Sequence, residues 1–178
     1  MNYSKLKIGE EAPEIIFTVI EIPQGSSNKY EFDMNFETIR LDRVLHSPTY
    51  YPGDYGFIPE TLSEDGDPAD VLVIISKPTF PGCLLRVKPI GLLKMEDSGK
   101  IDYKVLGVAY DDPNYKNVST YKGLHEHLIA QIEHFFETYK LLENKMTKVL
   151  GWEDEIAARR YIKQVHEAYL SKTQTAKE

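Results

Sequence analysis

The sequence predicts a mainly β fold with added helices (α+β), in which a small closed β-barrel carries two C-terminal helices packed outside. Two observations favour this class. Short runs rich in β-branched and aromatic residues, joined by turns that contain Gly and Pro, come first along the chain. Apolar residues at helical spacing follow them. No repeat or linker divides the 178 residues, so a single domain over residues 1–178 is expected.

Alternating residues predict the first strands. Ile15 to Ile22 is rich in β-branched residues and predicts a strand. Lys29 to Asp33 alternates charged with aromatic residues, and Ile39 to Leu45 repeats the alternation. Arg43 then falls on an otherwise apolar face. It is either an arginine that reaches solvent at a strand end or an anion ligand at the mouth of the barrel.

The middle of the chain predicts a loop and four further strands. Tyr50 to Pro59 is interpreted as an aromatic loop that presents some tyrosine hydroxyls to a site, because no strand or helix period explains these tyrosines as core. Asp102 and Lys104 lie two apart, so they share a face if the last of these strands begins early. The expected strands are Val71–Ile75, Leu84–Val87, Ile90–Met95 and Tyr103–Ala109.

The remaining residues predict two amphipathic helices. Apolar residues recur at helical spacing from Leu124 to Leu142, which predicts one long helix. Gly151-Trp152 is expected to break the chain before a second helix, about Asp154 to Ser171. His125 and His127 point about 200° apart on a helix and make no zinc pair. Surface, core or interface roles are expected for the histidines.

Composition limits the partners. The net charge is −7, which opposes non-specific binding to nucleic acid or to an anionic membrane. Cys83 is the only cysteine, so an intrachain disulfide and a multi-cysteine metal site are excluded. No secretory signal or run of 18 apolar residues is found, and a soluble cytoplasmic protein is expected.

One acidic loop organises the chain. Asp65-Gly66-Asp67-Pro68-Ala69-Asp70 holds three carboxylates directly before a buried strand. Two carboxylates about 4 Å apart repel by roughly 4 kcal/mol at an effective dielectric near 20, so a cation is expected among them. The alternative is a solvated acidic turn. A calcium EF-hand is excluded, because Asp70 stands where Gly is needed and Ser76 where Glu is needed.

Polar residues that strand alternation leaves unexplained form two sets. A carboxylate set without His or Cys favours magnesium or manganese over zinc, while Lys and Arg suit phosphoryl oxygens. Together the sets predict a metal and phosphate site. The acids are Glu21, Glu31, Asp65, Asp67, Asp70, Asp97 and Asp102, and the cations and hydroxyls are Lys29, Arg43, Tyr51, Tyr55, Lys104, Tyr139 and Lys140.

Seven motifs in order make this sequence resemble the family I soluble inorganic pyrophosphatases. The resemblance runs from about residue 14 to the Gly151-Trp152 pair, and the order of the motifs is far more specific than any one of them. The motifs are E-I-P-x-G-x-x-N-K-Y-E (Glu21–Glu31), L-D-R (Leu41–Arg43), Y-P-x-D-Y-G (Tyr51–Gly56), D-G-D-P-x-D (Asp65–Asp70), K-M-x-D (Lys94–Asp97), D-x-K (Asp102–Lys104) and H-F-F-x-x-Y-K (His134–Lys140).

The resemblance implies an OB-like five-stranded barrel, magnesium-dependent hydrolysis of diphosphate by a metal-activated water, and a homohexamer. It implies that Asp65, Asp70, Asp97 and Asp102 hold metal and that Asp67 accepts the proton. Many bacterial members have a second acid where this chain has Ser98, which concerns the outer metal shell. The implied phosphate ligands are Lys29, Arg43, Tyr55, Tyr139 and Lys140, and Glu21, Glu31, Tyr51 and Lys104 line the same cavity.

Two other functions are compatible with parts of the sequence. An oligonucleotide-binding barrel would stack its tyrosines on bases, but the acidic charge opposes this. A hydrolase of nucleoside triphosphates or polyphosphate would use the same metal chemistry, but no Walker-type glycine loop is present.

Overall fold

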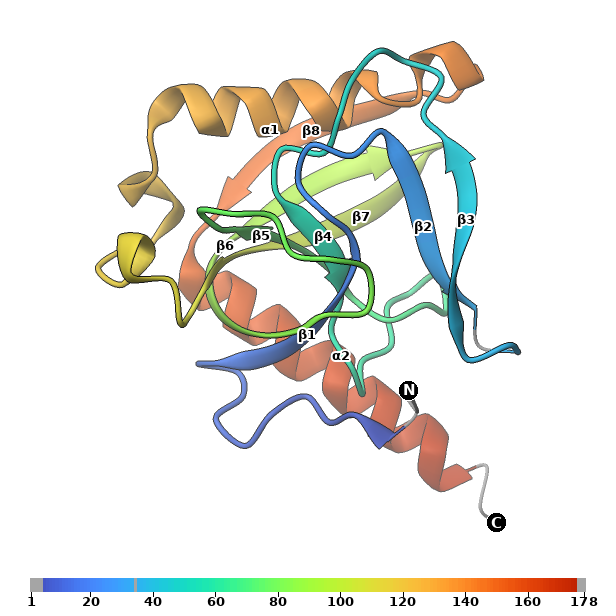
Figure 1. The fold of residues 1–178 in the computed structure, drawn as a ribbon. Coiled ribbons are helices and arrows are strands. Elements are labelled where there is room, and N and C mark those ends of the chain that lie inside the picture. The colour runs from blue at the N-terminus through green and yellow to red at the C-terminus, as the bar shows by residue number, and fades with distance from the viewer. Residues whose placement is uncertain (1–4, 34, 176–178) are drawn as a thin grey trace.

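The computed structural model describes residues 5–33 and 35–175. Five strands form a closed ring in the order β1-β4-β5-β7-β6, and a further pairing of β1 with β6 completes it. The predicted closed five-stranded barrel is therefore confirmed (Figure 1). The strands of the ring are β1 (Ile16–Ile22), β4 (Asp54–Phe57), β5 (Asp70–Ile74), β6 (Leu84–Asp97) and β7 (Lys100–Ala109).

Two further strand groups extend the ring. β8 (Thr147–Glu153) pairs with the second half of β6, and β2 (Asn28–Asp33) pairs with β3 (Thr38–Val44) in a separate two-stranded sheet. This β2–β3 hairpin stands beside the barrel in Figure 1. All strand pairs are antiparallel except β5–β7, which places Asp70 directly opposite Lys104.

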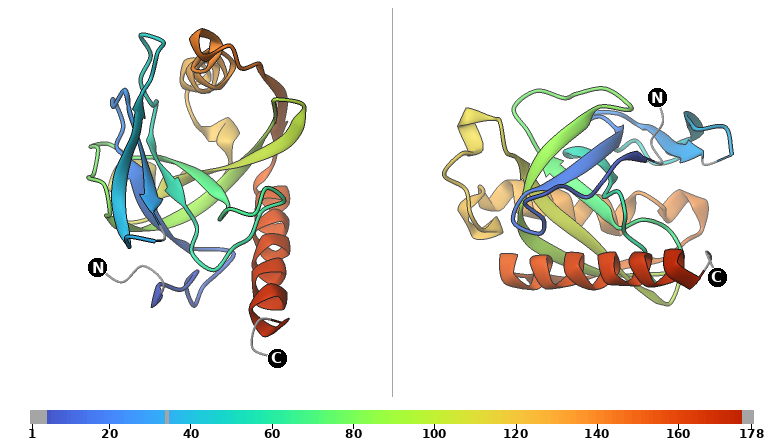
Figure 2. Two further views of the ribbon diagram at one scale, coloured as in Figure 1. Left: turned by 90° about the vertical axis from the view of Figure 1, so that its right-hand side faces the viewer. Right: turned by 90° about the horizontal axis from the view of Figure 1, so that it is seen from below.

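Both helices lie outside the ring of strands, as expected, and on different sides of it (Figure 2). Helix α1 (Glu126–Thr138) adds its aromatic residues to one core cluster, and α2 (Glu155–Thr175) adds Ala158, Ile162 and Val165 to the other. Successive β5 residues alternate between these two clusters, as the period of a strand requires. Among the described residues, no helix is long and apolar enough to cross a membrane.

The helix boundaries correct one expectation. Helix α1 begins after His125, whose Nδ1 accepts a hydrogen bond from the His127 N–H, and it ends at Thr138 rather than Leu142. Leu142 is 61% exposed, so it does not continue the buried stripe. Helix α2 begins where predicted, because Asp154 accepts a hydrogen bond from the Ala157 N–H and so caps its first turn.

Three strand predictions were wrong in detail. β4 lies inside the segment read as an aromatic loop, and Gly151-Trp152 lies within β8 rather than at a chain break. Trp152 is held there by an indole N–H that donates to Glu133 of α1 over 2.7 Å. The two strands expected before and after Pro89 are one long strand, because Pro89 sits at a register shift in the β6–β7 ladder.

Gly56 permits the close packing of β4 against β1. A Cβ at this position would lie 1.9 Å from the Val19 carbonyl oxygen, which cannot move without disturbing the ladder. We expect Gly56→Ala to lower the free energy of unfolding by about 3 kcal/mol, measured by urea titration. Gly123→Ala is the matched control, because its Cβ would meet nothing nearer than 3.6 Å. Equal unfolding midpoints for the two variants would contradict the close packing.

Candidate functional site

The acidic loop leads directly into β5 and is shaped by its own backbone. Gly66 takes a positive φ of 96°, and the Asp67 N–H donates to Asp65 Oδ1 over 3.1 Å. The Asp67 carbonyl oxygen accepts a hydrogen bond from the Ser63 N–H over 2.8 Å. Burial raises the pKa of Asp67, and the neighbouring charges of Asp65 and Asp70 raise it further.

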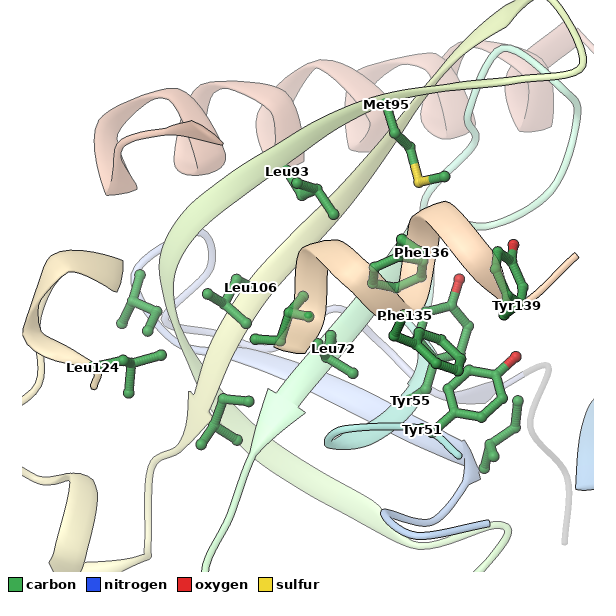
Figure 3. Close-up of a cluster of buried hydrophobic side chains, with 14 of the residues drawn as sticks. Tyr51, Tyr55, Leu72, Leu93, Met95, Leu106, Leu124, Phe135, Phe136 and Tyr139 are labelled. Atoms are coloured by element: carbon green, nitrogen blue, oxygen red, sulfur yellow. The ribbon is translucent and has the colours of Figure 1, made fainter. Parts of the chain in front are cut away.

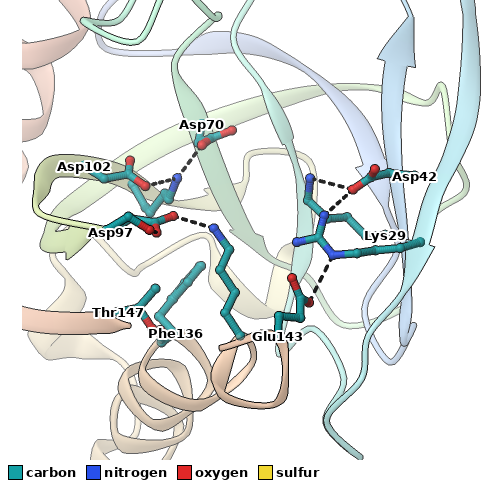
Figure 4. Close-up of polar contacts among 12 residues, drawn as sticks. Lys29, Asp42, Asp70, Asp97, Asp102, Phe136, Glu143 and Thr147 are labelled. Carbon is teal, nitrogen blue, oxygen red and sulfur yellow. Dashed lines mark hydrogen bonds and ion pairs between the residues drawn. The ribbon is translucent and has the colours of Figure 1, made fainter. Parts of the chain in front are cut away.

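Lys104 lies between two of the predicted acids. Its ammonium contacts Asp70 Oδ2 and lies 2.7 Å from Asp102 Oδ2, and its side chain is only 7% exposed (Figure 4). Burial alone would lower the pKa of Lys104, but Asp70 and Asp102 outweigh burial and raise it. Burial raises the pKa of Asp102 despite the contact with Lys104. The parallel pairing of β5 with β7 brings these groups together.

Lys140 forms a second contact of the same kind. Its ammonium contacts Asp97 Oδ2 at the end of β6, and the Ser98 hydroxyl donates to Asp97 Oδ1 over 2.9 Å. Burial raises the pKa of Asp97, but Lys140 outweighs this and holds it below its usual value. Lys140 follows helix α1, so the acids of the barrel are linked to the segment that leaves this helix.

The β2–β3 hairpin carries the other cations. The Lys29 ammonium contacts Glu31 and lies 3.3 Å from Asp42 Oδ2, while Arg43 Nη1 contacts the same Asp42 oxygen. Arg43 Nε donates to Glu143 Oε1 over 3.0 Å. Asp42 and Glu143 were missed as functional candidates. Asp42 adjoins Arg43 in the L-D-R motif, which is a signal in the sequence, whereas Glu143 is 100 residues away from Arg43 and gives none.

The tyrosine rings correct the reading of residues 50–59 as a loop without core residues. Tyr51, Tyr55 and Tyr139 are buried in the same cluster as Phe135 and Phe136. Figure 3 shows the hydroxyls of the three tyrosines at the edge of this cluster. Burial raises the pKa of Tyr51, and its electrostatic neighbours include both Asp70 and Arg43. The Tyr51 ring centroid lies 5.3 Å from that of Tyr55 and 4.7 Å from that of Phe135, so ring packing fixes Tyr51 in this cluster.

Glu21 joins β1 to the hairpin. Its Oε1 accepts a hydrogen bond from the Phe32 N–H over 2.7 Å. Burial raises the pKa of Glu21 to about 8, because few polar partners replace the water that the carboxylate loses.

A cavity of about 1010 Å³ adjoins the acids. Asp65, Asp97, Asp102 and Lys140 line it, together with Tyr161 and other residues of α2. Asp67, Asp70 and Lys104 are not among its lining residues, but Lys104 joins Asp70 to Asp102, which does line it. A cavity shared by all the predicted site residues stays a prediction. Among the described residues, no three acidic, histidine or cysteine side chains are arranged to hold an ion as they stand.

The donor set nevertheless fits a hard cation by its chemistry. The carboxylates of Asp70, Asp97 and Asp102 contact ammonium groups, so each of them faces a cation. Carboxylate oxygens are also the ligands that hard divalent cations prefer. The fold and this set of side chains define a class of protein: a small β-barrel with carboxylates, ammonium groups and a guanidinium suited to divalent cations and phosphoryl oxygens.

Comparison with known proteins identifies the family. A family model described as inorganic pyrophosphatase matches residues 18–170. An inorganic pyrophosphatase of a Nostoc species is 48% identical over 169 residues, covering 95% of this chain and 99% of the relative. The chain belongs to the inorganic pyrophosphatase family.

Solved structures agree with this assignment and with the OB-like fold. The crystal structure of the inorganic pyrophosphatase from Thermus thermophilus superposes with a TM-score of 0.92 at 45% identity, covering 95% of this chain and 99% of that one. The enzyme from Helicobacter pylori superposes with a TM-score of 0.89 at 38% identity, covering 93% of this chain and 99% of that one.

Proposed function

We propose that this protein hydrolyses inorganic diphosphate to two orthophosphates, and so draws forward the reactions that release diphosphate. The observation that carries the proposal is the contact of Asp70, Asp97 and Asp102 with two ammonium groups in a chain of this family. A site that already balances carboxylates against cations suits a substrate of several negative charges bound with metal ions.

Magnesium is the proposed metal, with manganese or another hard divalent ion as the alternative. Asp65, Asp70, Asp97 and Asp102 would hold the ions, because carboxylate oxygens are the donors that these cations prefer. When bound, the ions would lower the pKa of water toward neutrality and neutralise phosphoryl oxygens. Ser98 would act on this shell through Asp97, to which its hydroxyl donates.

The chain's own residues divide the remaining work. Asp67 takes the proton from the attacking water, since it lies in the same loop as two of the metal-binding acids. Substrate oxygens are bound and the leaving phosphate is neutralised by Lys29, Arg43, Tyr55, Tyr139 and Lys140. Glu21, Glu31, Tyr51 and Lys104 would line the same cavity, where Glu31 contacts Lys29 and Lys104 contacts Asp70. No covalent intermediate is required.

The proposal extends to the state of the protein. The partner is the small molecule diphosphate rather than nucleic acid or a membrane, which is supported by the net charge of −7. A homohexamer rests on the family resemblance, and the cytoplasmic location expected from the sequence stays a prediction. The single domain over residues 1–178 stays a prediction, supported by a family match that spans residues 18–170.

A comparison of substrates tests the function. With magnesium present, we expect rapid phosphate release from diphosphate and release at least about 100-fold slower from ATP and from polyphosphate. Release from ATP but not from diphosphate would support the metal and phosphate site but contradict diphosphate as its substrate. A salt-sensitive mobility shift with single-stranded DNA, without phosphate release from any substrate, would favour the oligonucleotide-binding alternative.

A further inference from the structure

Glu143 contacts Arg43 although neither the motifs nor the proposed chemistry gives it a role. It belongs to the short 3₁₀ helix η4 (Leu141–Glu143), which follows Tyr139 and Lys140. Its side chain is only 7% exposed, and its Oε1 accepts the Arg43 Nε–H over 3.0 Å. A carboxylate this buried is costly unless it is paired, so the contact with Arg43 is strongly constrained.

The two carboxylates around Arg43 hold its guanidinium at different nitrogens. Glu143 accepts from Nε, and Asp42 accepts from Nη1. Because the guanidinium is planar and its five N–H donors have a fixed geometry, holding two nitrogens sets the orientation of the whole group. The N–H groups that remain, including both on Nη2, are then directed without further adjustment.

Glu143 also connects two parts of the molecule. Arg43 belongs to the β2–β3 hairpin, which forms a sheet of its own outside the ring. Glu143 belongs to the segment that follows α1, where the Lys140 ammonium contacts Asp97 (Figure 4). The Arg43–Glu143 pair is thus a link between the hairpin and the segment that carries Tyr139 and Lys140.

We propose that Glu143 is a positioning residue for substrate binding, which holds the Arg43 guanidinium and ties the hairpin to the segment after α1. This inference rests on the proposed function, in which Arg43 binds a phosphoryl oxygen. The inference also predicts the direction in which substrate affinity changes when Glu143 is removed. If Glu143 acted only through its negative charge, its removal would strengthen binding of an anion; as a positioning residue, its removal weakens binding.

The test first compares three variants in two measurements. We expect Glu143→Ala to raise both the KM for diphosphate and the calorimetric Kd for methylenediphosphonate, a non-hydrolysable analogue, by about tenfold with magnesium present. Glu143→Gln keeps an oxygen that can accept the Arg43 N–H, so its effect is smaller. Glu11→Ala is the matched control, because Glu11 lies 3.2 Å from Arg86 but is 61% exposed.

Combination with Arg43→Ala separates positioning from a general structural role. If Glu143 acts through Arg43, adding Glu143→Ala to Arg43→Ala changes KM by less than about twofold. A tenfold cost in both backgrounds, an unchanged KM or a tighter Kd would overturn the inference. Because methylenediphosphonate binding is measured directly, an inactive wild-type protein would instead count against the proposed function.

Discussion

Replacing Asp67 with asparagine is expected to lower the turnover of diphosphate by roughly 10²–10⁴-fold, the contribution of a general base. Asparagine has the same shape but cannot take a proton. The loop should keep its conformation, because the hydrogen bonds described for Asp67 use its backbone N–H and carbonyl oxygen, which asparagine retains. Turnover is measured as phosphate release at saturating substrate.

The control for this variant is Glu64→Gln, which removes one carboxylate from the same segment at a position with no proposed role. We expect Glu64→Gln to turn over within about twofold of wild type, and both variants to unfold within about 2 °C of it. Wild-type turnover in Asp67→Asn would remove Asp67 from the mechanism. A large loss in both variants would indicate a general effect of charge in the loop.

Local sequence pattern predicted the strands whose residues are nearly all buried. The apolar run of β5 and the β-branched run of β1 are buried almost throughout, so period and composition were sufficient. β4 was not predicted as a strand, because a glycine such as Gly56 usually indicates a loop. Its role in the strand is visible only in the structure, where Gly56 packs closely against Val19. β8 was not predicted either, because Trp152 is held in it by a hydrogen bond to Glu133 of α1, a contact that local sequence does not show.

The site divides in the same way. The loop acids could be found directly, because three carboxylates in one short segment repel one another whatever the fold. Asp97 and Lys140 acquire a common environment only when β6 and the end of α1 meet. Their assignment in the sequence depended on the order of motifs. Neither charge repulsion in a local segment nor the order of motifs could identify Glu143, because its partner Arg43 is distant in the chain and its own segment has no distinguishing pattern.

Three acids of the proposed metal site contact ammonium groups of the chain itself. Lys104 and Lys140 offset part of the charge of Asp70, Asp97 and Asp102, because two ammonium groups face three carboxylates. The same carboxylates would have to exchange ammonium contacts for metal contacts on binding. Metal affinity therefore reflects a competition inside the site as well as the attraction of the acids for a cation.

Removing divalent ions with EDTA is expected to reduce phosphate release to the uncatalysed background, and returning magnesium in excess should restore it. Folding should survive the removal because the ammonium contacts remain. Magnesium should also raise the unfolding temperature, since a ligand at about 100 times its Kd stabilises the folded state by about 2.7 kcal/mol. This second measurement does not depend on activity.

Variants of the acids locate the ions. We expect Asp70→Asn and Asp102→Asn to lose most of the magnesium-dependent rise in unfolding temperature, while Asp111→Asn, whose carboxylate lies 3.6 Å from Arg86 on the exposed surface, keeps it. Manganese in place of magnesium would change the preferred ion and leave the site intact. Full activity in EDTA, or an equal rise in all three variants, would contradict a metal site built on these carboxylates, because neutralising a ligand must weaken the ion that it holds.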